Sequence, residues 1–370
     1  MRMGPARLED WLRDRYFTAT YDLSSSGVEP WSYGELRDRL GLDPARLDRI
    51  RFTDNPSLGN GCLREALAAR FAGGDPDRVM TTHGSSEAAF LVFNELLSAG
   101  DRVVVVEPAY HALRDVPEAI GCEVVPWRLP AERDFAADLA ELDRLVAPGT
   151  RMVIVNLPHN PTGATITAAQ QRELVDVVRG AGAYLLWDAA FAELTYGGPA
   201  LPDPALTYRR CISLGTLSKA YGLPGLRVGW CVADPDLLPR LLPLRDRMTL
   251  ALSPLVEFVA TAAVRRAGVL LADRLRQAAE NRESLLAWAA TAPGVAPLAP
   301  PAAGVTAFPR LLVDDVDAFC TGLLAAEGVL LAPGSCFGHP DRVRLGYGGN
   351  RRDFELGLER TSAMLAKVAR

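Results

Sequence analysis

The chain has 370 residues, of which 49% are hydrophobic and 23% are charged, as expected for an ordinary globular enzyme with room for two domains. Its formal net charge of −5 gives no indication of a nucleic-acid partner or of binding to an anionic membrane, although it is compatible with a cationic substrate. No apolar run approaches the roughly 18 residues needed to span a bilayer. The six cysteines are widely spaced, which is typical of small buried side chains in a reducing compartment, so we expect a cytoplasmic protein.

The predicted elements begin with a short amphipathic helix, because Leu8, Trp11, Leu12 and Tyr16 fall at helical spacing. An irregular stretch over 22–30 follows, so the N-terminal segment is interpreted as an arm. From residue 79 onward, short β-rich runs alternate with helical stretches, and the runs cover 79–82, 103–106, 123–127, 152–156, 184–187, 211–214 and 228–232. Continuously apolar runs favour strands covered by helices on both faces, so the sequence predicts a doubly wound α/β protein.

The C-terminal part has a different pattern. Residues 253–291 are predicted to form one long or broken helix, and a Pro/Gly/Ala-rich passage over 293–304 follows. A strand near 305–308, a helix after Asp315 and a strand over 343–347 then indicate a smaller α+β domain. We therefore predict an arm and part of the small domain over 1–45, a large domain over 46–275 and a C-terminal small domain over 276–370.

Lys219 is the most informative residue. Of 40 Lys and Arg residues, only Lys219 and Lys367 are lysines. Arginine stays protonated, whereas a desolvated lysine amine can lose its proton and attack a carbonyl, so we interpret Lys219 as a Schiff-base lysine. Thr216 and Ser218 precede it, and Arg227 follows in a glycine-flanked segment suited to a phosphate. This set suggests pyridoxal 5'-phosphate (PLP), whereas a bare Ser-Lys pair alone would indicate an ordinary surface lysine.

Further motifs follow predicted strands, at the sheet edge where ligands of open α/β sheets bind. Ser85 and Ser86 open an apolar helix, and backbone N–H groups at such an end bind anions. Asp188 ends a strand and is suited to hold a pyridine nitrogen protonated, with a capping role as its alternative. Asn160 is suited to bind the phenolic oxygen of the cofactor and Tyr110 to stack on its ring, against a plain turn and simple partial burial.

Together these motifs resemble the fold-type-I PLP-dependent enzymes, in particular the class I/II aminotransferase family, from about Asp22 to Arg344. The resemblance implies a large domain with a mostly parallel seven-stranded sheet, a smaller α+β domain, and a homodimer with active sites at the subunit interface. It assigns catalysis to Lys219 and Asp188. It assigns cofactor binding to Ser85, Ser86, Tyr110, Asn160, Asp188, Thr216, Ser218, Lys219 and Arg227.

The resemblance also implies substrate contacts. Arg344 is similar to the arginine that clamps the α-carboxylate of an amino-acid substrate, a bidentate task suited to a guanidinium. Arg342, two residues away, is the rival for that role. Gly27 resembles the arm glycine whose backbone approaches the same carboxylate, with a plain turn glycine as its alternative.

Two positions depart from the family pattern. Phe191 stands three residues after Asp188, where a tyrosine is usual, and it cannot donate a hydrogen bond to the cofactor. The loop before Gly59 lacks the tyrosine that normally crosses to the phosphate of the partner subunit. Both departures argue against a routine transaminase.

Segments 22–28, 81–87, 158–161 and 215–232 closely resemble the capreomycidine synthase family, which cyclises a hydroxylated arginine in antibiotic biosynthesis. The resemblance implies a PLP-dependent cyclase, in which Lys219 removes the α-proton, the β-hydroxyl leaves, and the guanidine nitrogen adds to the β-carbon. A carboxylate near the guanidinium would help, and we consider Asp54 and Glu29 for it, each with a solvated surface role as its alternative. His83 is a candidate to protonate the leaving hydroxyl or a purely structural residue.

Two other functions are weighed against the cyclase. An ordinary L-amino acid aminotransferase shares every step up to removal of the α-proton. A cofactor-binding regulator would need a DNA-binding module, and no basic winged-helix pattern precedes residue 22. We expect a small-molecule substrate, no metal, no nucleic acid and no membrane.

Overall fold

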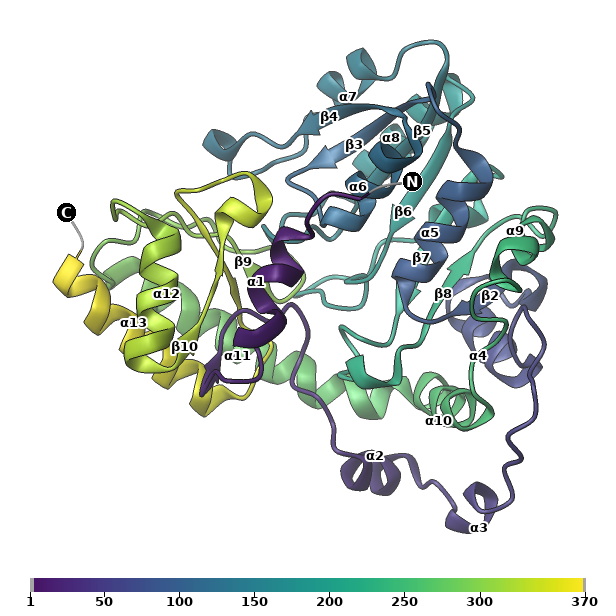
Figure 1. Cartoon of the computed structure of the whole chain (residues 1–370), viewed down its shortest axis with the longest axis horizontal. Helices are drawn as coiled ribbons and strands as arrows, with labels where there is room; N and C mark the ends of the chain where they lie inside the picture. Colours follow the sequence, from purple (N-terminus) through teal and green to yellow (C-terminus); the bar gives the residue numbers. More distant parts are fainter. Residues whose placement is uncertain (1–2, 369–370) are drawn as a thin grey trace.

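The computed structural model of the chain describes residues 3–368. Residues 1–2 and 369–370, at the outer ends of the predicted arm and small domain, lie outside the described residues. Figure 1 shows a larger body built on a sheet, and a smaller body beside it that contains the C-terminal helices. The predicted limits of the domains stay a prediction.

The larger body contains the predicted seven-stranded sheet, in the order β2-β8-β7-β6-β5-β3-β4. β8 runs antiparallel to both of its neighbours, and the other neighbouring strands are parallel. All seven runs foreseen from the sequence form these strands. Their bounds are β2 Val79–Thr82, β3 Arg102–Glu107, β4 Glu123–Arg128, β5 Thr150–Asn156, β6 Tyr184–Asp188, β7 Cys211–Thr216 and β8 Gly229–Val232.

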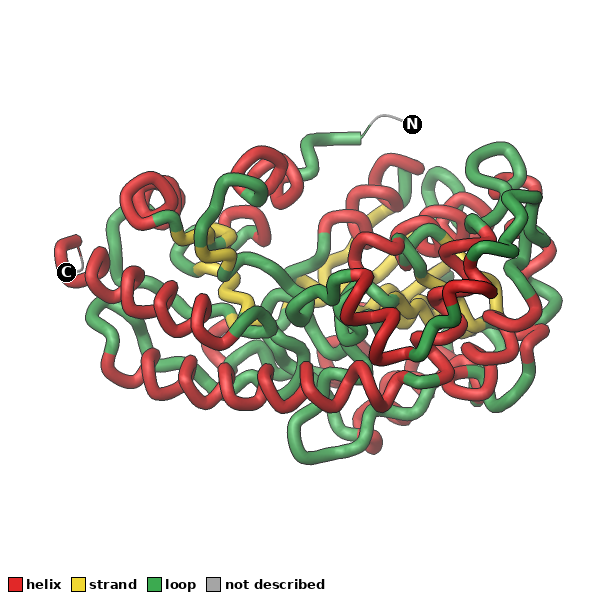
Figure 2. The backbone as a smooth tube through the Cα atoms, turned by 90° about the horizontal axis from the view of Figure 1, so that it is seen from below, coloured by secondary structure: helices red, strands yellow, loops and turns green. Residues whose placement is uncertain are grey.

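Both faces of this sheet are buried. Along β3, Val104 and Val106 belong to one hydrophobic cluster, while Val103 and Val105 belong to the other. This alternation explains why the strand is apolar without interruption, since each face needs its own apolar side chains. Figure 2 shows the strands enclosed by helices. Those of the larger body are α4 Gly61–Phe71, α5 Ser85–Leu96, α6 His111–Ile120, α7 Leu139–Leu145, α8 Ala168–Gly180 and α9 Leu238–Arg245.

The helix predicted over 253–291 is broken, as α10 (Pro254–Arg265) and α11 (Ala267–Thr291) meet at Arg266, whose φ of −112° is not helical. The antiparallel sheet of the smaller body has the order β11-β12-β9, with β9 at Thr306–Ala307, β11 at Ala332–Pro333 and β12 at Val343–Gly346. Asp315 caps the predicted helix, since its carboxylate accepts the backbone N–H of Ala318. The remaining C-terminal helices are α12 Val316–Glu327 and α13 Arg351–Val368.

The N-terminal arm connects the two bodies. Its first helix, α1 (Arg7–Arg15), confirms the amphipathic helix predicted there. β1 (Tyr21–Asp22) pairs with β10 (Val329–Leu330), and the backbone N–H of Val28 donates to the carbonyl of Lys219 at 3.2 Å. Two further helices follow, α2 Tyr33–Leu40 and α3 Pro44–Leu47. The short 3-10 helices are η1 Pro76–Arg78, η2 Ala131–Arg133, η3 Pro204–Leu206, η4 Pro224–Leu226 and η5 Gly334–Phe337.

None of the helices within residues 3–368 combines the length and apolar character needed to cross a membrane.

Candidate active site

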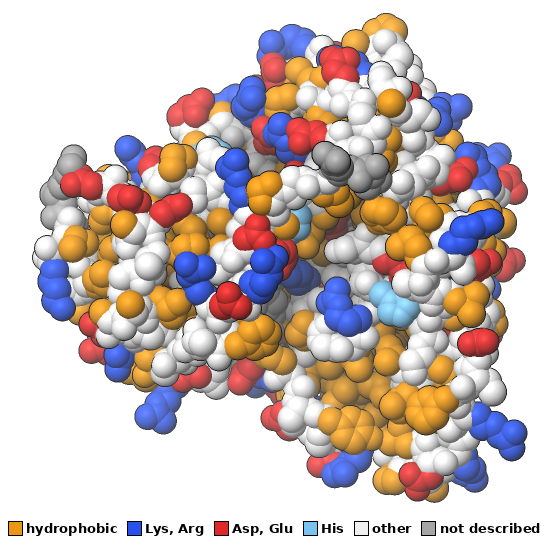
Figure 3. All heavy atoms as spheres, viewed as in Figure 1, with side chains coloured by type: hydrophobic (Ala, Val, Ile, Leu, Met, Phe, Trp, Pro, Cys, Tyr) orange, Lys and Arg blue, Asp and Glu red, His pale blue; other side chains and the backbone are white. Residues whose placement is uncertain are grey.

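A cavity of about 560 Å³ lies where the sheet, the arm and the smaller body meet. Figure 3 shows this face hollowed between the two bodies. The strands β5, β6 and β7 lead into the cavity with their carboxyl ends, as in other open α/β sheets. Ten residues predicted for the site line it: Ser85, Ser86, Tyr110, Asn160, Asp188, Thr216, Ser218, Lys219, Arg227 and Arg344.

Lys219 lies in the turn that follows β7. Its Nζ donates a hydrogen bond to Ser26 Oγ of the arm at 2.7 Å. Burial, and then the positive charge of Arg344, lowers the pKa of Lys219 to about 8, while Asp188 acts in the opposite direction. Compared with an ordinary lysine, a much larger fraction of such an amine is neutral near pH 8, and only the neutral amine can act as a proton acceptor or nucleophile.

Asp188 ends β6 and is 7% exposed. Its Oδ1 accepts the backbone N–H of Ala190 at 3.0 Å. Burial raises the pKa of Asp188 to about 6, and the Ala190 hydrogen bond and the Lys219 charge oppose this rise. A buried carboxylate without an arginine partner is suited to hold a cationic ring nitrogen.

Asn156 ends the neighbouring strand β5 and links two predicted site residues. Its Nδ2 donates to the carbonyl of Asp188 at 3.1 Å, and its Oδ1 accepts the backbone N–H of Asn160 at 2.9 Å. Asn160 is thereby held in place with its side chain in the cavity, where its Oδ1 accepts from Arg344 Nη1 at 3.3 Å. Sequence reasoning did not single out Asn156.

Backbone and hydroxyl donors that are suited to bind an anion lie at one end of the cavity. Gly84 precedes α5, so no side chain caps the first N–H groups of that helix. A Cβ on Gly229 would lie 2.4 Å from the nitrogen of Ser85, so only glycine lets β8 approach this helix end so closely. Arg227 and Ser218 line the same end, with Arg227 Nη1 3.5 Å from Ser218 Oγ.

Arg344, on β12, is 2% exposed. It donates to Asn160 Oδ1 and, from Nη2, to the carbonyl of Ser24 at 2.7 Å, and its buried Nε has no acceptor among the described residues. Burial lowers the pKa of Arg344 to about 10. Its rival Arg342 instead donates to the carbonyl of Phe308 at 2.8 Å and does not line the cavity. The geometry therefore favours Arg344 as the carboxylate-binding residue.

Two predicted substrate contacts do not line the cavity. Gly27 lies against the turn that carries Lys219, where an added Cβ would be 3.1 Å from the carbonyl oxygen of Ser218. Asp54 lies exposed in the loop before α4 and does not reach the cavity of its own chain. The alternative Glu29 pairs with Arg274 at 2.7 Å and thereby anchors the arm. Within one chain, neither carboxylate is placed to meet a substrate guanidinium.

His83 is also outside the cavity. Its Nδ1 lies 3.1 Å from Glu87 Oε2, and Glu87 bonds Thr249 in turn. This pairing joins the segment before α5 to the first turn of that helix and supports the structural alternative for His83.

Besides Asn156, sequence reasoning missed Ser26 and Glu9, which the fold also brings to the cavity. Ser26 contacts Lys219, and it stands in the serine run already noted in the arm, which was a usable signal. Glu9 of α1 also lines the cavity, with its Oε1 3.4 Å from the hydroxyl of Tyr110. Nothing in the sequence around Glu9 distinguishes it from a surface acid.

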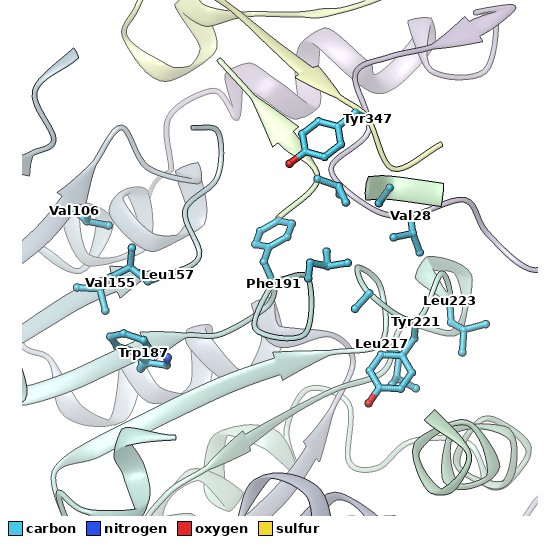
Figure 4. Close-up of a cluster of buried hydrophobic side chains, with 14 of the residues drawn as sticks. Val28, Val106, Val155, Leu157, Trp187, Phe191, Leu217, Tyr221, Leu223 and Tyr347 are labelled. Atoms are coloured by element: carbon cyan, nitrogen blue, oxygen red, sulfur yellow. The ribbon is translucent and has the colours of Figure 1, made fainter. Parts of the chain in front are cut away.

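The phenylalanine that departs from the family pattern lies at the inner wall of the cavity. Phe191 is 4% exposed, and Lys219 Nζ lies 5.6 Å from the centre of its ring. Figure 4 shows Phe191 in a buried cluster that also contains Tyr347. The ring therefore supplies a wall without a hydrogen-bond donor.

The polar groups that line the cavity fit PLP. The anion site with Ser85, Ser86, Thr216, Ser218 and Arg227 would hold its phosphate, Asp188 its pyridine nitrogen, Asn160 its phenolic oxygen, and Lys219 its aldehyde. The unsatisfied Nε of Arg344 leaves a place for a substrate carboxylate.

The chain resembles proteins of known structure and function along its whole length. It is 49% identical to capreomycidine synthase of Streptomyces vinaceus, over 99% of this chain and 95% of that protein. It is 32% identical to valine–pyruvate aminotransferase of Mycobacterium tuberculosis, over 84% of this chain and 82% of that protein. The crystal structure of the PLP-dependent cyclase OrfR in complex with Au matches with a TM-score of 0.94 at 45% identity, covering 99% of this chain and 98% of that one.

A PLP-dependent aminotransferase from Streptococcus suis matches with the same TM-score of 0.94 at 28% identity, over 100% of both chains. The family model of aminotransferase class I and II matches residues 49–360, which include every predicted site residue except Gly27. The predicted fold class is confirmed, and the anion site, the buried carboxylate and the lysine occur together as this fold requires. The chain therefore belongs to the class I and II aminotransferase family of PLP-dependent enzymes.

Proposed function

We propose that this enzyme converts a β-hydroxylated arginine into a cyclic guanidino amino acid of the capreomycidine type, as a step of antibiotic biosynthesis. The observation that carries the proposal is the full-length relationship to capreomycidine synthase, together with the close structural match to a PLP-dependent cyclase. Phe191 supports it, since this position departs from the aminotransferase pattern within the cavity itself.

The net reaction needs no partner substrate. The bond between the β-carbon and the hydroxyl oxygen breaks, a bond between a guanidine nitrogen and the β-carbon forms, and one water is released. Carbon oxidation levels balance overall, so no oxidant, reductant or keto acid is consumed. This balance distinguishes the cyclase from an aminotransferase, which requires an acceptor for the amino group.

PLP, when bound, supplies an electron-withdrawing ring that stabilises negative charge at the α-carbon of the substrate. Lys219 is the residue suited to move the α-proton, because burial has lowered its pKa to about 8 and its Nζ is the only amine lining the cavity within the described residues. Asp188 is buried next to it and holds positive charge on the pyridine side. The Ser26 hydroxyl, 2.7 Å from Nζ, orients the amine.

The remaining task is orientation. Arg344 binds the α-carboxylate through a guanidinium that Asn160 and the carbonyl of Ser24 hold in place. The arm and α1 cover the cavity, with Leu8, Leu12 and Phe17 among its lining residues, and so limit the access of water. An intramolecular addition gains most from such positioning, since both reacting groups belong to one molecule.

The second candidate is an L-amino acid aminotransferase. The relatives that carry this name favour it, because Lys219, Asp188 and Arg344 serve both reactions up to the removal of the α-proton. The two functions differ in whether a keto acid is needed.

Mass spectrometry of products from a panel of mono- and dihydroxylated arginines, without any keto acid, tests the proposal. We expect a cyclic product that has lost one water. Lys219→Ala should abolish its formation, whereas Lys367→Ala, which removes the other lysine of the chain, should leave it intact. Consumption of the amino acid only after addition of a keto acid would contradict the cyclase and support the aminotransferase.

A homodimer is part of the proposal. Its support is a group of exposed hydrophobic side chains on the larger body and the loop before α4: Phe52 at 80%, Met248 at 48%, Leu250 at 39% and Leu255 at 38% exposure. Figure 3 shows hydrophobic side chains gathered at the lower right, over the region of α10. Such a dimer would also give the loop that carries Asp54 a partner surface to contact.

A cytoplasmic location is likewise proposed. All six cysteines are free in the structure, and Cys211, Cys231 and Cys320 are buried. Thiols of this kind are typical of proteins kept in reducing compartments.

A further inference from the structure

Among the described residues, two carboxylates line the cavity, and one of them has no ion-pair partner. Among the residues that line the cavity, only Asp188 and Glu9 are acidic. Asp188 lies at the end of β6 beside Lys219 and serves the pyridine nitrogen. Glu9 lies on α1, and its role remains to be explained.

Glu9 has no ion pair with any described lysine, arginine or histidine. On the same helix, by contrast, Asp10 pairs with Arg13 at 2.6 Å. The polar contact of Glu9 is the Tyr110 hydroxyl, 3.4 Å from its Oε1, and Tyr110 is the residue predicted to stack on the cofactor ring. The carboxylate of Glu9 thus lies in the cavity of the candidate site, and no described lysine, arginine or histidine lies within ion-pair distance of it.

The charge of Glu9 acts on the other groups of the cavity. Burial is the main influence on the pKa of Lys219, Arg344 and Tyr110, and in each case the Glu9 charge contributes a rise in the pKa. Groups on three separate segments sense this carboxylate, which is what a residue facing a shared cavity produces.

α1 holds Glu9 in a defined position. Trp11, which does not line the cavity, donates from its Nε1 to the carbonyl of Leu331 at 2.9 Å, so the helix is anchored to the smaller body. The guanidinium of Arg15 lies 4.1 Å from the centre of the Trp11 ring and covers that anchor. Substrate binding therefore does not carry the entropy cost of ordering the helix on which Glu9 lies.

We propose that Glu9 is the residue that binds the guanidinium of the substrate, and that it thereby selects arginine derivatives and keeps the guanidine folded over the reacting carbons. The inference rests on the proposed function and adds the specificity residue to it. A carboxylate and a guanidinium match in charge and in bidentate geometry. Arg344 holds one end of the amino acid and Glu9 the other, so the chain between them is bent back toward Lys219.

Binding of L-arginine and L-citrulline to the holoenzyme tests this role. Both lack the β-hydroxyl and cannot complete the reaction, and citrulline replaces the guanidinium with a neutral group of similar size. Titration calorimetry gives the Kd of each. In the wild type we expect arginine to bind at least roughly tenfold more tightly than citrulline, which is the preference expected of a charge-assisted contact.

Glu9→Gln should reduce this preference to within about threefold by weakening arginine alone. Glu9→Asp, which keeps the charge on a shorter side chain, should retain part of it. Asp10→Asn is the matched control on the same helix, and Asp54→Asn tests the competing carboxylate. Both controls should keep the full preference, and circular dichroism melts check that each variant is folded.

Three results would each overturn the role of Glu9. They are an undiminished preference for arginine in Glu9→Gln, a collapse of the preference in Asp54→Asn, and equal binding of arginine and citrulline to the wild type. Failure of the proposed function is a separate result, because it would appear as absence of a cyclic product from hydroxyarginine whatever the preference between arginine and citrulline.

Discussion

At the scale of single residues, the site contains ionisable groups that are poorly solvated. Asp188 and Arg344 are buried and Lys219 is partly buried, and loss of solvation shifts the pKa of each in the direction that favours its neutral form. Buried ionisable groups lower the free energy of unfolding unless a ligand provides them with a partner. The residues that serve function at these positions therefore reduce the stability of the ligand-free protein. A bound cofactor and substrate would supply the missing partners.

Asp188→Asn should stabilise the cofactor-free protein at pH 8.5. The pKa of Asp188 rises from 3.8 to about 6 on folding, so its ionised form costs stability above pH 6 and the cost disappears as the pH falls below 3.8. The rise in the pKa corresponds to a cost of roughly 3 kcal/mol in the free energy of unfolding. We expect Asp188→Asn to recover only about 2 kcal/mol of it, because the substitution also removes the negative charge that favours protonated Lys219. At pH 8.5 Lys219 is mostly neutral, which limits that loss.

Thermal melts of the cofactor-free wild type and variant over pH 5 to 8.5 measure the effect. The difference should shrink toward the acidic end. With PLP added, the order should reverse, since the variant lacks the carboxylate for the pyridine nitrogen. A variant less stable than the wild type at every pH without PLP would contradict the assignment of a burial cost.

Arg344→Lys should raise KM for the hydroxyarginine by about 100-fold, with a smaller change in kcat, because an ammonium cannot bind the α-carboxylate in bidentate fashion. Arg342→Lys is the matched control, as Arg342 donates to the carbonyl of Phe308 outside the cavity. Steady-state kinetics on both variants decide between the two arginines. A larger rise in KM for Arg342→Lys would reverse the assignment.

At the scale of elements, the arm positions the site through its backbone. Gly346 of β12 donates to the carbonyl of Leu23, and the arm then passes Ser24, which bonds Arg344, and Ser26, which bonds Lys219. The arm lies so close to β12 that a Cβ on Gly346 would be 1.7 Å from the carbonyl oxygen of Ser25. Packing between β12 and the arm therefore sets the geometry of both cationic residues.

Gly346→Ala should displace the arm, destabilise the protein by about 1–3 kcal/mol and lower cyclase activity strongly. Gly349→Ala is the matched control, because nothing lies within 4 Å of the Cβ it would add. Urea melts and product assays on both variants give the comparison. Equal activity in the two variants would show that the arm does not position the site.

At the scale of the whole molecule, the exposed hydrophobic side chains are the feature that a single chain leaves unexplained. Phe52 and Leu255 are exposed at 80% and 38%, in a chain that otherwise buries two extensive hydrophobic clusters. Apolar surface of this kind favours association of subunits. A dimer formed there would bring the loop before α4 against a second chain.

The double variant Phe52→Asp/Leu255→Asp should shift the protein from dimer to monomer, since two buried charges oppose an apolar interface. Leu312→Asp is the control, as Leu312 has a similar exposure of 40% but lies in the smaller body. Light scattering coupled to size exclusion measures the masses. A monomeric wild type would refute the homodimer.

The sequence by itself determined the family, the cofactor and the order of strands in the chain. These depend on local features: an isolated lysine among arginines, hydroxyls beside it, and apolar runs whose length and alternation follow from burial on both faces of a sheet. The seven apolar runs form seven strands for this reason. Lys219 lies in the connection between the strands at 211–216 and 229–232.

Only the tertiary structure decided which distant residues share the site. Ser26 and Lys219 are 193 residues apart, Asn160 and Arg344 are 184 apart, and Glu9 and Tyr110 are 101 apart. The sequence does not distinguish Arg342 from Arg344. In the structure Arg344 of β12 lines the cavity, whereas Arg342 donates to the carbonyl of Phe308 outside it. Glu9 and Asp54 are both plain surface acids by sequence. Their difference arises because packing of α1 against the smaller body brings one of them over the cavity, and no local pattern encodes that contact.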